Sequence, residues 1–247
     1  MKKILLAAAI GSILFASAGV YAQPSGKDEI ISMFKQLDLS RSQKQEVRAI
    51  MQQLREDNSL YAADKSEIKL QIDSLFALDT WDSALANGIV DMQILSSTQT
   101  ALNIATAKHQ AFQVLTDEQK TELSEKTPST NKQKSAQKKI AKLSRRLNLS
   151  ETQDADLESL MEKQIADISA FESEINAHKL AKKALIQADE FDQDAWNNLQ
   201  MNYASTRASI RLIKLETRFN FRKVLNEVQL EKLSKIENRK KHGQRRG

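Results

Sequence analysis

The stretch LTDEQKTEL, residues Leu115–Leu123, contains a five-residue phrase that occurs four times in this chain of 247 residues. The copies read LSRSQ from Leu39, LTDEQ from Leu115, LSETQ from Leu149 and LNEVQ from Leu225. In the first three copies a serine or threonine stands three residues before a glutamine, which is the pattern of a capping box. The four phrases therefore predict four helix starts, with asparagine as a weaker cap in the last copy and each leucine packed inward.

The phrases belong to an internal repeat. Positions 37–43 align with 147–153, and positions 114–124 align with 224–234, at one constant shift and without a gap. We call this shift the repeat offset. Its constancy across both phrases and the span between them indicates a duplicated unit. The repeated anchor and cap positions are Leu39, Ser40, Gln43, Leu115, Thr116, Gln119, Leu149, Ser150, Gln153, Leu225, Asn226 and Gln229.

The duplication divides the chain into segments. We assign residues 23–126 to a first unit and residues 140–236 to a second unit. Residues 127–139 form a linker that runs into the next helix. Residues 237–247 carry five basic side chains and one acidic side chain, and we expect them to form a flexible basic tail.

The N-terminal segment, residues 1–22, has the pattern of a secretory signal peptide. Lys2 and Lys3 precede a short apolar run, and small residues lead to a cleavage site near Ala22. The apolar run is too short to span a bilayer. The chain has no cysteine, so no disulfide can form. We therefore expect a soluble periplasmic protein with no stable membrane insertion, held together by packing alone.

Composition and periodicity favour an all-α fold. Two prolines and six glycines are too few for the many tight turns of a β-rich protein. Apolar residues recur every seven positions from Val47 to Leu75, and polar breaks follow at residues 78–80 and 188–190. Each unit is predicted to contain four helices, two of them long and arranged as a hairpin. Because one hairpin buries little surface, we expect the two units to complete each other.

Polar residues interrupt this apolar pattern differently in the two units. Gln164, His178 and Lys182 occupy the positions that Leu54, Ile68 and Ile72 occupy in the first unit. Several unpaired polar groups would be too costly in a closed core. Three interpretations remain: the faces are partly open, polar partners meet across the two halves, or the second copy has drifted.

One surface is a candidate for binding. Arg207, Arg211, Lys214, Arg218 and Arg222 recur at helical spacing and form what we call the basic stripe. Apolar residues lie between them, Phe219 included, and the first unit has no such stripe. Such a face suits capture of flexible, acidic or amphiphilic polypeptides. The alternative is a solvated face that pairs with Glu216 and with acidic residues of a neighbouring helix.

Enzymatic chemistry finds no support in the motifs. The chain has no cysteine nucleophile, no glycine-rich phosphate loop and no HExxH sequence. His109, His178 and His242 lack a histidine or cysteine at the spacing of a helical metal site. We therefore expect no enzyme, no cofactor and no metal. The basic stripe would also suit nucleic acid, but export argues against that partner.

Taken together, the signal peptide, the helical units and the paired L-[ST]-x-x-Q phrases resemble the Spy/CpxP family of periplasmic LTxxQ-motif proteins. The resemblance covers residues 28–236 as two family units. It implies a thin, curved, cradle-shaped dimer, here a covalent pseudo-dimer that is monomeric or pairs again. It also implies an ATP-independent chaperone for unfolded or misfolded periplasmic proteins in envelope stress. The alternatives are a regulator docked on the periplasmic domain of a sensor kinase, and a metal-binding stress protein.

Overall fold

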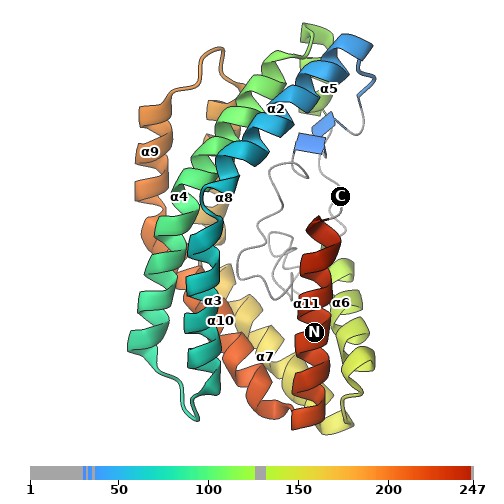
Figure 1. Cartoon of the computed structure of the whole chain (residues 1–247), viewed down its shortest axis with the longest axis vertical. Helices are drawn as coiled ribbons and strands as arrows, with labels where there is room; N and C mark the ends of the chain where they lie inside the picture. The colour runs from blue at the N-terminus through green and yellow to red at the C-terminus, as the bar shows by residue number, and fades with distance from the viewer. Residues whose placement is uncertain (1–29, 32, 35–36, 126–131, 246–247) are drawn as a thin grey trace, which may run out of the picture.

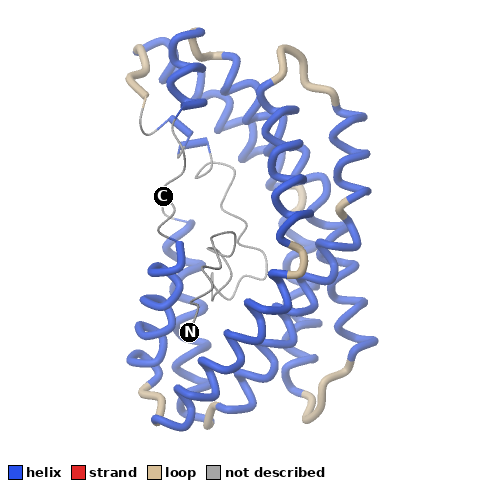
Figure 2. Tube along the Cα trace, turned by 180° about the vertical axis from the view of Figure 1, so that it is seen from behind, coloured by secondary structure: helices blue, strands red, loops and turns tan. Residues whose placement is uncertain are grey.

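The structure, a computed structural model, describes residues 30–31, 33–34, 37–125 and 132–245. These residues are helical apart from short connections and include no strand, so the all-α prediction is confirmed. The predicted signal peptide lies outside the described residues. Within the described ranges, no helix combines the length and the apolar character that crossing a membrane requires. Figures 1 and 2 show the helices in an elongated body, with α5 near one end and α6 and α11 in the other half.

The first unit contains the helices α2 (Arg41–Ser59), α3 (Ala62–Ala77), α4 (Ser83–Gln113) and α5 (Asp117–Glu125). The turn between α3 and α4 falls where the polar break predicted it. Asp82 ends this turn as the N-cap of α4, and its carboxylate accepts a hydrogen bond from the Leu85 backbone N–H at 2.9 Å.

The second unit contains α6 (Lys132–Leu147), α7 (Glu151–Ser169), α8 (Glu172–Gln187), α9 (Gln193–Asn202), α10 (Ala204–Val224) and α11 (Glu227–Arg245). Asp192 caps α9 as Asp82 caps α4, with a bond of 2.8 Å to the Ala195 N–H. Asn148, between α6 and α7, has a left-handed φ of 55°, a conformation that asparagine tolerates and that ends a helix. The backbone of α11 is helical through Arg245, within the segment predicted to be a flexible tail.

The first long helix of each unit is divided in two, which the heptad pattern did not predict. The break falls at Leu60–Tyr61 in the first unit and at Ala170–Phe171 in the second. In each, the aromatic backbone N–H bonds three residues back, Tyr61 to Asn58 at 3.3 Å and Phe171 to Ile168 at 3.0 Å. A bond of this kind tightens the end of a helix. Neither break contains a proline or a glycine, so the sequence pattern predicts one continuous helix in each unit.

The second long helix differs between the units. In the first unit α4 is unbroken over 31 residues. In the second unit Tyr203 separates α9 from α10, and its ring stacks on His178 with centroids 3.9 Å apart. The equivalent positions in the first unit hold the buried Gln93 and Ile68. The break thus accompanies the replacement of Gln93 and Ile68 by a stacked aromatic pair.

Three apolar clusters form the core. One lies in the first unit and includes Val47, Leu54 and Phe112. The second lies in the second unit and includes Leu157, Phe221 and Leu233. The third joins the units, because α3 and α4 contribute most of it and α10 the rest: Ile68, Ile72, Leu75, Ala86, Ile89, Val90, Leu215 and Phe219. The two units therefore share one buried core in addition to their own.

Aromatic contacts between the units occur at equivalent positions. Trp81 packs edge-on against Phe219 with ring centroids 5.5 Å apart. Phe191 packs against His109 at 5.7 Å, and the repeat offset makes these two residues the counterparts of Trp81 and Phe219. Each unit thus presents the same two positions to the other, and α4 contacts α8, α9 and α10 across the boundary.

Candidate functional site

All four repeated phrases form the predicted helix caps. In the first copy, the Gln43 N–H donates to Ser40 Oγ at 3.2 Å, and Gln43 Oε1 accepts from the Ser40 N–H at 2.9 Å. The copies at Thr116 and Ser150 make the same two bonds. Asn226 replaces the hydroxyl with its amide oxygen, which accepts from the Gln229 N–H at 2.9 Å. The asparagine copy is therefore as complete as the others.

The glutamines also join the two phrases of each unit, which sequence reasoning missed. Gln43 Nε2 donates to Gln119 Oε1 at 2.7 Å and to the Val114 carbonyl at 2.9 Å. Gln119 Nε2 donates in return to Gln43 Oε1 at 3.2 Å and to the Asp38 carbonyl at 2.9 Å. The pair fastens the start of α2 to the start of α5, so we call it the glutamine clasp.

The second unit repeats the glutamine clasp. Gln153 Nε2 donates to Gln229 Oε1 at 2.8 Å and to the Val224 carbonyl at 2.8 Å. Gln229 Nε2 returns bonds to Gln153 at 2.8 Å and to the Asn148 carbonyl at 3.2 Å. The sequence carried one signal for this pairing, since the two glutamines are 76 residues apart in both units.

The basic stripe lies on α10 as predicted, but its members are half-buried and contact neighbouring helices. Arg207 Nη1 donates to Gln200 Oε1 at 3.3 Å, and burial lowers the pKa of this guanidinium. Arg211 Nη2 donates to Ser97 Oγ of α4 at 2.9 Å. Burial also lowers the pKa of Lys214, with a smaller contribution from Arg211. These three side chains therefore help to pack α10.

The last turns of α10 bind α3 and α11. Arg218 and Arg222 each lie 3.8 Å from a carboxylate oxygen of Glu237. Both guanidinium groups also lie 5.1 Å from the centre of the Phe76 ring. Phe219, which the sequence placed in the binding surface, is 3% exposed and belongs to the core between the units. The carboxylate that pairs with Arg218 and Arg222 therefore belongs to the neighbouring helix α11.

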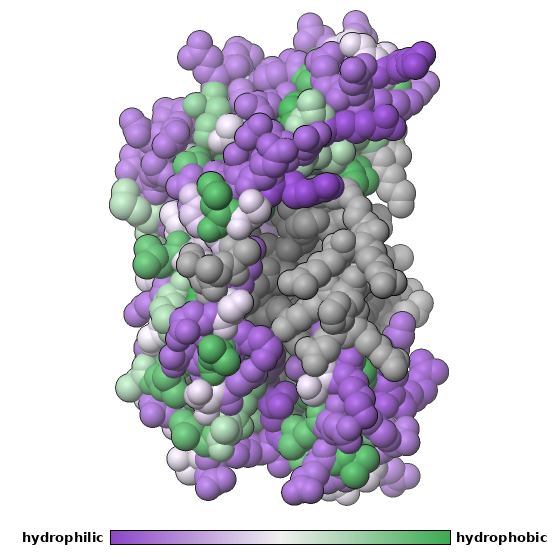
Figure 3. All heavy atoms as spheres, in the orientation of Figure 1, coloured by the Kyte–Doolittle hydropathy of each residue, from purple (hydrophilic) through white to green (hydrophobic). Residues whose placement is uncertain are grey.

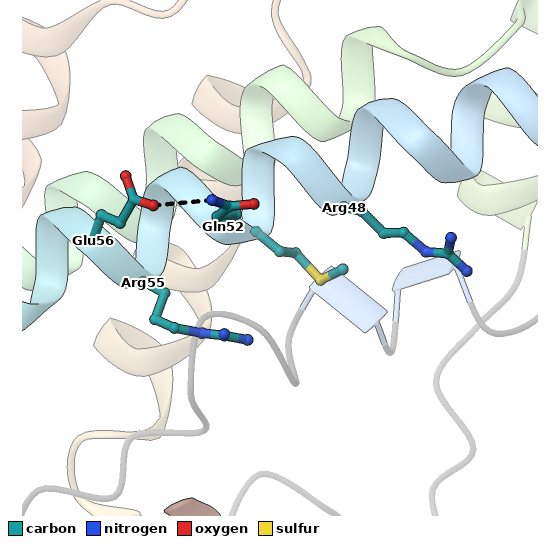
Figure 4. Close-up of a pocket in the computed structure, with 5 residues that line it drawn as sticks. Arg48, Gln52, Arg55 and Glu56 are labelled. Carbon is teal, nitrogen blue, oxygen red and sulfur yellow. Dashed lines mark hydrogen bonds between the residues drawn. The ribbon is translucent and has the colours of Figure 1, made fainter. Parts of the chain in front are cut away.

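An open pocket lies on the surface of α2. Its volume is about 420 Å³, and Arg48, Met51, Gln52, Arg55 and Glu56 line it. Both arginines are exposed while the methionine is half-buried, and Gln52 Nε2 donates to Glu56 Oε1 at 3.1 Å (Figure 4). The α2 pocket thus places two accessible cations beside a polarizable apolar side chain. Such a surface can hold acidic or amphiphilic segments without demanding one sequence.

Large apolar side chains are also exposed on several helices. Figure 3 shows apolar side chains dispersed among hydrophilic ones on one face of the molecule. Leu70 and its counterpart Leu180 are both exposed, at 60% and 68%, so this feature is common to the two units. Among the described residues, the large apolar side chains exposed by 60% or more are Leu60, Leu70, Leu95, Leu180, Met201 and Val228.

The polar residues of the second unit form a connected cluster around the Tyr203 break. Gln200 Nε2 lies 3.3 Å from His178 Nε2, and Thr206 donates to Glu174. His178 and Gln200 both belong to the second unit, so these polar partners meet within one half rather than across the two. Burial, with smaller contributions from the charges of Lys182 and Arg207, lowers the pKa of His178 to about 4.

The His178 shift predicts an acid-dependent loss of stability. Below its usual pKa of 6.5 the unfolded chain binds a proton that the folded chain accepts only near pH 4. The free energy of unfolding should therefore fall as pH drops from 6.5 towards 4, by about 1 kcal/mol for this half-exposed ring. Urea unfolding at about pH 7 and about pH 4 measures the loss.

A His178→Gln variant is the control for that experiment, because it keeps a polar side chain and removes the titration. The variant should lose about 1 kcal/mol less than the wild type between the two pH values. Equal losses in both proteins would show that the titration of other groups accounts for the effect.

Of the other two histidines, only His109 has a described side chain. His109 is buried, and its Nδ1 lies 3.2 Å from the Ile186 carbonyl oxygen. The His242 side chain is outside the described part of the structure. Across the described residues, no group of three or more histidine, aspartate or glutamate side chains is arranged to hold a metal ion.

Comparison with known proteins identifies the first unit. Residues 25–127 match the sequence model described as LTXXQ motif family protein. No curated protein and no solved structure was found to match the chain. The matched residues contain both phrases of the first glutamine clasp, and the second unit repeats them at the repeat offset. Through its first unit, this chain is similar to the LTXXQ motif family.

Proposed function

We propose that the protein is an ATP-independent chaperone of the bacterial periplasm, exported by its signal peptide, that holds unfolded or misfolded envelope proteins under stress. The match of residues 25–127 to the LTXXQ motif family supports this function. The observation that carries it is the α2 pocket, where exposed Arg48 and Arg55 flank Met51 on a body with further exposed leucines. The cations attract acidic clients over a distance, and apolar contacts retain them.

The proposed architecture is a Spy-like pseudo-dimer in one chain. Two clusters confined to single units and one shared cluster are what a dimer of such units would contain. The equivalent contacts of Trp81 with Phe219 and of Phe191 with His109 support the same arrangement. A cradle built in this way has thin walls and a large surface for its size, which suits binding of extended chains.

Light scattering of a denatured client tests the proposal. The mature chain, added without nucleotide at a few-fold molar excess, should suppress aggregation. Arg48→Glu together with Arg55→Glu should weaken the suppression at least tenfold, because the reversal removes the attraction for acidic segments. Absence of suppression by the wild type would refute the chaperone function.

The matched control is Lys179→Glu together with Lys183→Glu. Both lysines are exposed on α8, so the change in total charge is the same at another place. Equal weakening by the two double variants would show that net charge, rather than the α2 pocket, governs binding. Capture of one stoichiometric sensor kinase from membranes, with no suppression of aggregation, would instead favour the regulatory function.

A further inference from the structure

The helix α6 has an unusual charge. Its sixteen residues include seven basic side chains and no acidic one: Lys132, Lys134, Lys138, Lys139, Lys142, Arg145 and Arg146. At 3.6 residues per turn, these positions share one side of the helix. The apolar positions Ile140, Leu143 and Leu147 fall on the opposite side. We call the basic side the cationic arc.

The apolar side of α6 is already occupied by the protein itself. Leu143 and Leu147 are buried with Phe221 and Leu233, and Ile140 packs against the same cluster. Ser144 Oγ donates to Asp154 Oδ2 of α7 at 2.8 Å. These contacts fix the rotation of the helix, and Lys142, Arg145 and Arg146 of the cationic arc are exposed.

The neighbouring carboxylates have partners of their own. The helix α11 lies beside α6, and its Glu231 bonds to Lys235 at 2.6 Å. Glu237 of α11 lies close to Arg218 and Arg222. Asp154 of α7 accepts the bond from Ser144. These three carboxylates are therefore engaged elsewhere, and the charge of the exposed Lys142, Arg145 and Arg146 acts outwards.

The fold does not require this charge. At the repeat offset, the exposed Lys142, Arg145 and Arg146 correspond to Ser32, Lys35 and Gln36. Only Arg145 has a basic counterpart. A helix that served only to cover the second unit could have had a mixed surface, so the uniform charge needs another explanation.

We propose that the cationic arc of α6 is a docking surface for anionic lipid membranes. Lysine and arginine side chains near such a surface are attracted to its negative charge, and their contributions add. Since the apolar side is buried, the contact is electrostatic and peripheral, without insertion. The arc has no aromatic residue of the kind that anchors protein interfaces, and no carboxylate that would define a complementary partner. A group of cations on one side of a helix is complementary to the continuous negative charge of an anionic phospholipid surface.

Cosedimentation of the mature chain with vesicles tests the proposal. The protein should bind vesicles of equal parts phosphatidylcholine and phosphatidylglycerol, and should not bind phosphatidylcholine alone. Raising the salt concentration should release it, because the attraction is screened. Lys142→Glu, Arg145→Glu and Arg146→Glu together should weaken the binding at least tenfold.

The matched control reverses three exposed cations of the first unit: Arg41→Glu and Lys44→Glu on α2, and Lys65→Glu on α3. It changes total charge equally, and it should leave vesicle binding within about threefold of the wild type. Circular dichroism of both triple variants checks that they remain folded. Equal losses in the two variants, or equal binding to both vesicles, would overturn the proposal. Binding of soluble polyglutamate but not of anionic vesicles would assign the arc to an acidic polypeptide instead.

Discussion

Replacing Phe219 by alanine should lower the free energy of unfolding by about 3–5 kcal/mol, the range for deleting a large aromatic side chain from a packed core. Phe219 is 3% exposed and packs edge-on against Trp81 of the other unit. Its loss leaves a cavity where α10 meets α3 and α4, and it removes an aromatic contact between the units. Urea unfolding followed by circular dichroism measures the change.

Leu95→Ala is the control, because this leucine is 79% exposed and its truncation should change stability by less than about 0.5 kcal/mol. The comparison also decides between two positions for Phe219. If the ring lay on an open binding surface, as the spacing along α10 suggested, Phe219→Ala would be as mild as the control and would chiefly weaken client binding. The buried position predicts the opposite result.

Gln43→Ala should cost about 2–3 kcal/mol, more than the loss of a cap alone. The substitution leaves the Ser40 N–H without its side-chain acceptor and takes the cross-link away from Gln119. It also removes the donor to the Val114 carbonyl. The expected result is a lower unfolding midpoint in urea, measured by circular dichroism.

Gln45→Ala, an exposed change on the same helix, should have little effect. A double-mutant cycle of Gln43→Ala with Gln119→Ala separates the capping function of Gln43 from its cross-link to Gln119. Residues in one hydrogen-bond network are not additive, so the double variant should cost less than the sum of the single ones. Strict additivity would mean that each glutamine acts only as a cap and that the clasp contributes nothing.

Local chemistry made much of the fold predictable. The serine, threonine and asparagine caps are read directly from the sequence, because a cap depends on residues three apart. The polar turn at residues 78–80 was equally visible, and Asp82 then starts α4. The duplication was apparent because the caps keep one offset. Each of these features depends on neighbours in the chain.

Features that depend on distant partners were not predictable. The clasp needs Gln43 and Gln119 to meet in space, and helix-start patterns do not specify which starts lie together. Phe219 was assigned to the surface because it lies among basic residues, yet Trp81 covers it. The sequence pattern places Arg218 among the client-binding residues, but the long arginine stem reaches back to Glu237 and Phe76. The breaks at Tyr61 and Phe171 carry no glycine or proline signal.

Joining two repeated units in one chain changes how the assembly behaves on dilution. Separate subunits dissociate when they are scarce, whereas a short tether keeps partners at an effective concentration on the order of millimolar. Because the two halves are encoded separately, each half can also change without the same change in the other. A mutation in a homodimer appears twice, but here His178 or the arc of α6 exists once. The linked halves can therefore specialise while their shared core still holds them together.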